Sequence, residues 1–122
     1  MARSTTVRKK PAVAPPPAAD PARAGKLFAV TRSPGTGWTA GAPLEEQPGW
    51  AEHAAFMNGL EASGFVVLGG PLEDTPYTML AVRAESEAEV RTTLAADPWE
   101  ANRTLETTRI ATWSLRLGAG RI

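Results

Sequence analysis

Three short segments of this chain are apolar at every position, at residues 27–30, 65–68 and 79–82. Successive side chains of a β-strand point to opposite faces of a sheet, so each segment predicts a strand that is apolar on both faces. The chain offers only two full helices, which can cover one face of such a sheet. A monomer seldom exposes an apolar patch as large as the other face. We therefore expect a homodimer in which the uncovered faces pack together. The alternative is that the N-terminal segment or a long loop covers that face.

The expected elements follow the order β-α-β-β-α-β. In the first helix, Trp50, His53, Met57 and Leu60 recur at helical spacing. Ser86 opens the second helix with a capping-box pattern, and Ala88, Val90 and Leu94 are its expected inward residues. The order predicts an α+β, ferredoxin-like fold with a four-stranded antiparallel sheet and helices on one face. The expected strands span residues 26–32, 65–69, 77–83 and part of 105–117. In the last of these, residues 111, 113, 115 and 117 are expected on one face. The expected helices span residues 49–63 and 86–96, and a further helical turn is expected from residue 97.

The two ends of the chain differ in composition. Residues 1–24 are rich in proline and alanine and carry five basic side chains against one acidic side chain. This segment predicts a disordered basic arm. We expect a single folded domain over residues 25–118 and a short tail over 119–122. Residues 25–122 hold eight basic and twelve acidic side chains, which disfavours nucleic acid as a partner.

Several chemistries are excluded by residue type. The chain has no cysteine and one histidine, which removes thiolate nucleophiles, disulfides, cysteine-based zinc sites and multi-histidine metal sites. We therefore expect neither a metal nor a cofactor. No apolar run reaches the roughly 18–20 residues of a membrane span. Because no apolar stretch follows the basic N-terminus, we expect a cytoplasmic protein without a secretory signal and without membrane contact.

His53 and Asp97 are the candidate catalytic residues. Histidine is the side chain that titrates near neutrality, and His53 lies on the apolar stripe of the first helix. Buried there, the imidazole needs a polar partner, and Asp97 lies at the end of the second helix on the same side of the sheet. A carboxylate that binds one ring nitrogen leaves the other as a base. The structural alternatives are a satisfied core histidine and a helix cap, since Asp97-Pro98-Trp99-Glu100 is also a helix start.

The loop between the first strand and the first helix is long and rich in glycine. Its spacing is not that of a phosphate-binding loop, so we expect a flexible flap over a pocket rather than a nucleotide site. Trp38 lies in this loop and is a candidate to close over a flat ligand. Gly70, Pro71 and Trp99 are further candidates to shape the pocket. The remaining tryptophans are expected in the core or at an interface.

Taken together, these segments resemble the YCII-related family of dimeric α+β barrel proteins. The resemblance covers residues 27–117 and rests on the opening strand, on a helix that carries His53, on a strand that ends in Gly70-Pro71, and on Asp97-Pro98-Trp99, where the family has Asp-Pro-Phe. It implies a cavity between helix and sheet, with His53 and Asp97 as an acid–base pair. The longer loop before the first helix and the polar residues after Trp99 depart from the family pattern.

The leading hypothesis is a cofactor-independent enzyme, an isomerase or an elimination-type lyase that acts on a small organic molecule. His53 would be its general base and Asp97 would orient that base. The alternative is a non-catalytic dimeric domain that binds a small molecule or serves as an accessory module. A metal-dependent hydrolase is a further alternative, for which the sequence offers few ligands.

Overall fold

The computed structural model describes residues 25–122, and the arm expected over residues 1–24 lies outside the described residues. The described chain forms four strands, three α-helices and two short 3-10 helices. Their order is β2 (Lys26–Pro34), η2 (Leu44–Glu46), α1 (Trp50–Ala62), β3 (Val66–Pro71), β4 (Thr78–Ala84), α2 (Glu87–Leu94), α3 (Pro98–Ala101), β5 (Leu105–Thr112) and η3 (Ala119–Arg121).

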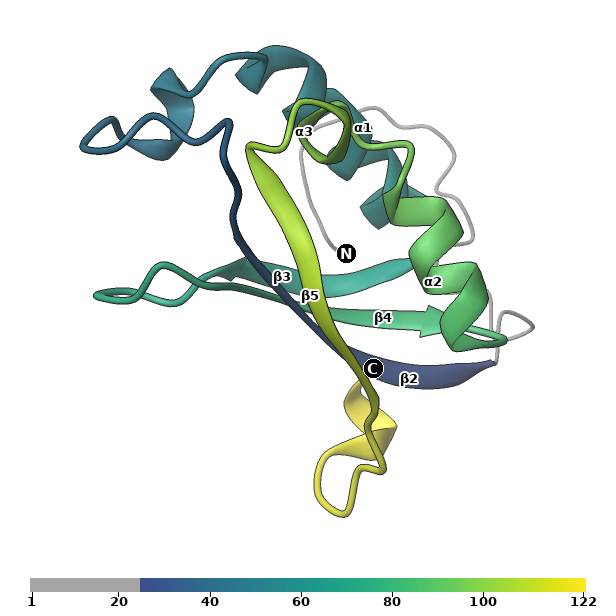
Figure 1. Cartoon of the computed structure of the whole chain (residues 1–122). Helices are drawn as coiled ribbons and strands as arrows, with labels where there is room; N and C mark the ends of the chain where they lie inside the picture. Colours follow the sequence, from purple (N-terminus) through teal and green to yellow (C-terminus); the bar gives the residue numbers. More distant parts are fainter. Residues whose placement is uncertain (1–24) are drawn as a thin grey trace.

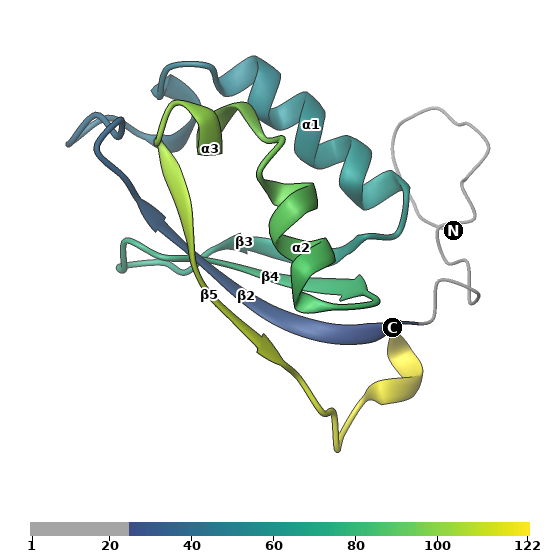
Figure 2. The same ribbon diagram turned by 45° about the vertical axis from the view of Figure 1, so that its right-hand side comes forward.

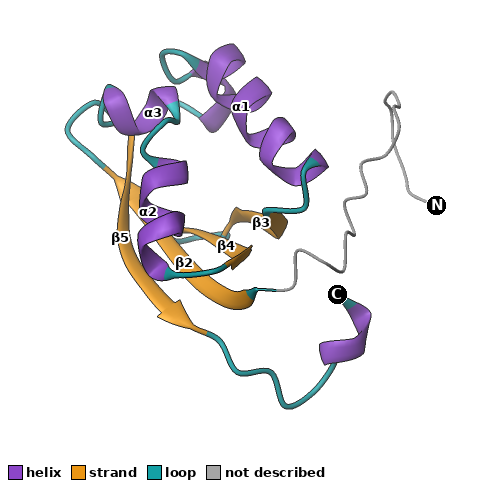
Figure 3. Ribbon diagram, turned by 90° about the vertical axis from the view of Figure 1, so that its right-hand side faces the viewer, coloured by secondary structure: helices purple, strands orange, loops and turns teal. Residues whose placement is uncertain are grey.

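The four strands form one antiparallel sheet in the order β3-β4-β2-β5. This is the ferredoxin-like arrangement that the sequence predicted. Helices α1, α2 and α3 all lie on one face of the sheet and together form a helical layer, and none of them covers the other face (Figures 1 and 2). The view in Figure 3 shows the helical layer above the strongly twisted sheet, with the C-terminal segment running past the sheet edge. No helix within residues 25–122 is long and apolar enough to cross a membrane.

The core lies between this helical layer and the sheet. Alternate positions of the strands point toward the helices, so Phe28 and Val30 of β2 meet Leu80 and Val82 of β4. Helix α2 closes this core with Val90 and Leu94, which are fully buried. Met57 and Leu60 of α1 are partly buried and pack against the same cluster.

The helix ends follow the local sequence. Gly49 and Gly64 flank α1 with φ angles of 79° and 86°, a left-handed backbone that glycine adopts without steric cost. At the start of α2, the Ser86 side chain accepts a hydrogen bond from the Glu89 backbone N–H at 3.1 Å, as the capping-box pattern predicted. The Glu89 carboxylate accepts the backbone N–H of Glu85 at 2.7 Å.

Two details of the sequence prediction were wrong. Ala88 is exposed, because α2 turns its Val90 and Leu94 side toward the core. The last strand ends at Thr112, so the expected apolar alternation does not continue to Leu117. The Trp113 backbone N–H still donates to the Leu27 carbonyl of β2 at 2.8 Å, and the chain then leaves the sheet. Trp113 and Leu117 are 45% and 89% exposed.

The glycine-rich loop before α1 is seated on the corner between α3 and β5. The backbone N–H groups of Gly35 and Gly37 donate to the carbonyls of Thr104 and Arg103 at 3.1 and 2.9 Å. A Cβ atom at Gly37 would lie 2.1 Å from a backbone carbonyl oxygen, so a side chain there would push the loop away. The buried Gln47 side chain accepts a hydrogen bond from the Thr39 backbone N–H at 2.7 Å and donates one to the Thr39 carbonyl at 2.9 Å. The loop therefore reaches α1 along a fixed path.

Candidate active site

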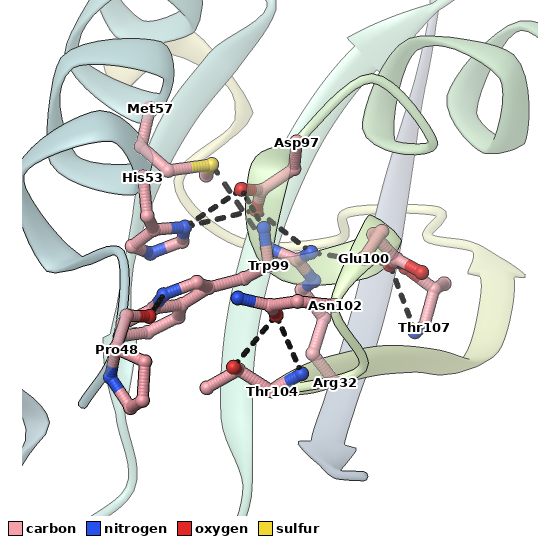
Figure 4. A network of polar contacts seen from close by, with 10 residues as sticks. All are labelled: Arg32, Pro48, His53, Met57, Asp97, Trp99, Glu100, Asn102, Thr104 and Thr107. Carbon is pink, nitrogen blue, oxygen red and sulfur yellow. Dashed lines mark hydrogen bonds and ion pairs between the residues drawn. The ribbon is translucent and has the colours of Figure 1, made fainter. Parts of the chain in front are cut away.

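His53 and Asp97 are in direct contact beneath α1. The Nδ1 atom of His53 lies 2.9 Å from each carboxylate oxygen of Asp97 (Figure 4). His53 comes from the second turn of α1, while Asp97 precedes α3, 44 residues later in the chain. Both side chains are buried, with relative exposures of 8% and 0%. The fold thus brings the two predicted residues together on the helical side of the sheet.

Asp97 has two other roles in the same place. One carboxylate oxygen, Oδ1, accepts the backbone N–H of Trp99 at 2.9 Å and so caps α3. The other, Oδ2, lies 2.9 Å from the guanidinium of Arg32. Burial raises the pKa of Asp97, but the hydrogen bonds from His53 and Trp99 and the charge of Arg32 outweigh burial, so the pKa lies below its ordinary value of 3.8. Asp97 is therefore a carboxylate at neutral pH.

The ionised carboxylate determines which ring nitrogen of His53 carries the proton. A carboxylate can only accept hydrogen bonds, so the Nδ1 atom that faces it must be the donor. In the neutral imidazole the lone pair then resides on Nε2, on the opposite side of the ring. Within residues 25–122, no hydrogen bond to Nε2 is found. The arrangement leaves this nitrogen available to take a proton from a bound molecule.

Trp99 fixes the plane of the imidazole. Its ring stacks on that of His53 with centroids 3.8 Å apart and an angle of 7° between the planes. Trp99 is fully buried, and its indole N–H donates to the Pro48 carbonyl at 2.7 Å. Trp50 and Trp38 pack on it with centroid distances of 5.8 and 6.4 Å.

Arg32 and Glu100 extend the polar network and were not among the predicted site residues. Arg32 is 1% exposed, and its guanidinium lies 3.1 Å from Glu100 as well as 2.9 Å from Asp97. Glu100 also accepts the backbone N–H of Thr107 on β5 at 3.0 Å. The signal in the sequence was an arginine that continues the inward alternation of Phe28 and Val30. The sequence pattern predicts the end of the strand at this position, whereas β2 continues to Pro34.

A cavity of about 360 Å³ opens beside His53, between α1 and the β3 edge of the sheet. His53 and Gly70 line it, as expected. Trp38, Pro71 and Trp99 are not among its lining residues: Trp99 lies behind the imidazole, and Trp38 packs on Trp99. From the long loop, only Leu44 reaches the cavity wall. The full lining comprises Leu44, Trp50, His53, Ala54, Met57, Asn58, Glu61, Val66, Leu68, Gly69, Gly70 and Leu80.

Within the described range, no group of three or more His, Asp or Glu side chains is placed to hold a metal ion. The nearby acidic groups, Asp97 and Glu100, are instead paired with Arg32.

Comparison with known proteins yields a structural likeness. No family model matches the chain, and no curated protein matches it. A solved structure does match: 5-chloro-2-hydroxyhydroquinone dehydrochlorinase (TftG) from Burkholderia phenoliruptrix AC1100, in complex with 2,5-dihydroxybenzoquinone. The two chains are 24% identical, the match covers 72% of this chain and 93% of the other, and the TM-score is 0.55. The likeness shows that the two proteins share a fold.

Proposed function

We propose that this protein is a cofactor-independent enzyme of the YCII-related family that removes a proton from a small ring-shaped organic molecule. The reaction class is an elimination or an isomerisation. The observation that carries the proposal is the contact between His53 Nδ1 and the ionised Asp97, with the imidazole at the wall of a cavity. The shared fold with a dehydrochlorinase, an enzyme that eliminates a small molecule from a ring, supports the elimination class.

The proposed chemistry uses three groups of the chain. His53 Nε2 takes a proton from a substrate carbon, and the electron pair of the broken C–H bond forms a new double bond. In an elimination, a leaving group departs with its own electron pair; in an isomerisation, the imidazolium returns the proton to another atom. Asp97 stabilises the imidazolium through Nδ1, and the Trp99 ring keeps the imidazole in place.

His53→Gln tests the proposed base. We expect turnover to fall by at least about 100-fold, because a positioned general base contributes roughly that factor or more. The measurement is chloride release from 5-chloro-2-hydroxyhydroquinone, the probe suggested by the structural neighbour. The denaturation midpoint serves as the control, since glutamine can still donate a hydrogen bond to Asp97. An active His53→Gln variant would refute the base, and a wild-type chain that binds the ring without turnover would favour the non-catalytic binding domain.

We further propose that the protein is a homodimer joined through the sheet face opposite the helices. Across this face, Ala29 pairs with Ala81 on β4 and with Ala111 on β5. This row of small side chains across three strands lets a second sheet approach closely. The helical layer covers only the other face (Figure 2).

Sedimentation analysis tests the dimer. The wild-type chain should sediment at twice its mass of 12.9 kDa. Ala29→Lys should shift it to the monomer, because an unpaired charge would lie at the centre of the interface. Lys26 is exposed at the start of the same strand, and a Lys26→Ala control should leave the dimer intact. A wild-type monomer at high concentration would overturn this proposal.

A further inference from the structure

The cavity beside His53 has apolar walls and a polar mouth. Side chains from η2, α1, β3 and β4 supply the walls, among them Leu44, Met57, Val66 and Leu80. Its volume of about 360 Å³ is at the small end for ligand pockets, and it suits one ring with a few substituents. Such walls take a ligand out of water, so any charge on the buried part of the ligand needs a partner from the protein.

The polar side chains that line the cavity come from α1. They include His53, Asn58 and Glu61, which follow one another along the helix. At a rise of about 1.5 Å per residue, Glu61 lies roughly 12 Å along the axis from His53. Asn58 and Glu61 are exposed, whereas His53 is buried. The base thus lies at the inner end of the cavity, and the amide and the carboxylate lie at its mouth.

Among the described residues that line the cavity, Glu61 is the one acidic side chain, and there is no lysine or arginine. Arg32 is buried, is paired with Asp97 and Glu100, and does not line the cavity. An anion that enters meets the Glu61 carboxylate and then loses its hydration against apolar walls. A cation is attracted by Glu61 but loses its hydration against the same apolar walls, and these two effects oppose each other.

We infer that the cavity selects uncharged ring molecules over their anionic analogues, and that Glu61 is the residue that excludes the anions. The inference rests on the proposed function, in that it takes the cavity beside His53 as the substrate site. It adds the charge class of the substrate: a neutral weak acid, which becomes negative only when His53 accepts its proton. The positive imidazolium is then adjacent to the new negative charge.

Three matched probes test this selection. 4-Hydroxybenzyl alcohol, 4-hydroxybenzoate and 4-hydroxybenzylamine share a ring and a hydroxyl group, and at neutral pH they carry no charge, a negative charge and a positive charge. Their dissociation constants are measured from NMR shifts of the α1 and β3 amides. We expect the alcohol to bind, the benzoate to bind at least about tenfold more weakly, and the amine to bind no more tightly than the alcohol.

Glu61→Lys is the decisive variant. Reversing the charge at the mouth should improve benzoate binding about tenfold relative to the alcohol. Lysine in the last turn of α1 is favourable toward the helix dipole, so the fold should tolerate it. Glu52→Lys is the matched control, because Glu52 is exposed on the same helix but does not line the cavity. It changes the net charge by the same amount and should leave the ratio of affinities unchanged.

The outcomes separate this inference from the proposed base. Equal binding of alcohol and benzoate by the wild type, tighter binding of the amine, no binding of any probe, or an unchanged ratio in Glu61→Lys would each overturn the charge selection. If Glu61→Lys improves benzoate binding relative to the alcohol as expected while His53→Gln keeps full turnover, the selection stands and the proposed base is wrong. If His53→Gln is inactive while benzoate binds as well as the alcohol, the base stands and the selection is wrong.

Discussion

Replacing Asp97 with alanine should lower the free energy of unfolding by about 3–5 kcal/mol, the usual cost of removing one partner from a buried ion pair. Asp97 is fully buried and accepts bonds from His53, Arg32 and the Trp99 backbone. Without it, the Arg32 guanidinium keeps Glu100 but loses its partner at 2.9 Å, and α3 loses its cap. Urea denaturation followed by circular dichroism measures the difference.

A surface ion pair gives the matched control. Glu87 and Arg91 form an exposed i,i+4 pair on α2, and Glu87→Ala should change stability by less than about 0.5 kcal/mol. If Asp97→Ala were as mild as this control, the buried network would not hold the α1–α3 corner together.

The acid dependence of the same variant gives a second readout. The pKa of Asp97 is lowered in the folded protein, so the unfolded carboxyl group takes up a proton at higher pH than the folded one. The stability that Asp97 contributes is therefore fully present above its ordinary pKa of 3.8 and is lost as the pH falls through the lower folded value. Asp97→Ala should lack this acid-sensitive part and show a flatter stability profile below about pH 4.

Trp99→Ala should destabilise the protein by about 3–5 kcal/mol, the usual range for emptying a buried tryptophan site. Trp99 is fully buried, stacks on His53, contacts Trp50 and binds the Pro48 carbonyl. Its loss would leave a large cavity between α1 and α3. The free energy of unfolding from urea titration is the measurement.

Trp99→Phe and Trp50→Phe separate packing from hydrogen bonding. Phenylalanine at position 99 keeps an aromatic face for His53 but leaves the Pro48 carbonyl without its 2.7 Å donor, which should cost about 1–3 kcal/mol. No hydrogen bond from the Trp50 indole is found within the described residues, so Trp50→Phe should be milder. A Trp99→Ala variant as stable as the wild type would contradict the role of this ring as the support of the imidazole.

Local patterns in the sequence were enough to predict the sheet. The fully apolar run at residues 27–30 and the capping box at Ser86 each specify an element without reference to the rest of the chain. The β-α-β-β-α-β order then leaves few topologies, and the observed strand order is the expected one. The end of β5 was less predictable, because Leu115 and Leu117 keep the alternating pattern after the chain has left the sheet.

The candidate site depended on contacts between distant parts of the chain. The sequence suggested His53 and Asp97 as partners, and the structure brings them to 2.9 Å; their catalytic use remains a proposal. The position of Arg32 beside Asp97 follows from the length of β2 and from the path of the chain before α3, which no local pattern reveals. The packing of Trp38 on Trp99 likewise depends on how the loop is seated.

The same Asp97 carboxylate caps helix α3 and binds the His53 imidazole, which affects how related chains can be compared. Under the proposed function, a related chain that had lost its activity would still need this aspartate to begin α3 and to neutralise Arg32. The presence of the aspartate in another chain would therefore say little about whether that chain is active. His53 bonds to Asp97 and stacks on Trp99 but caps no helix, so a glutamine or leucine at its position would be the more informative sign of lost activity.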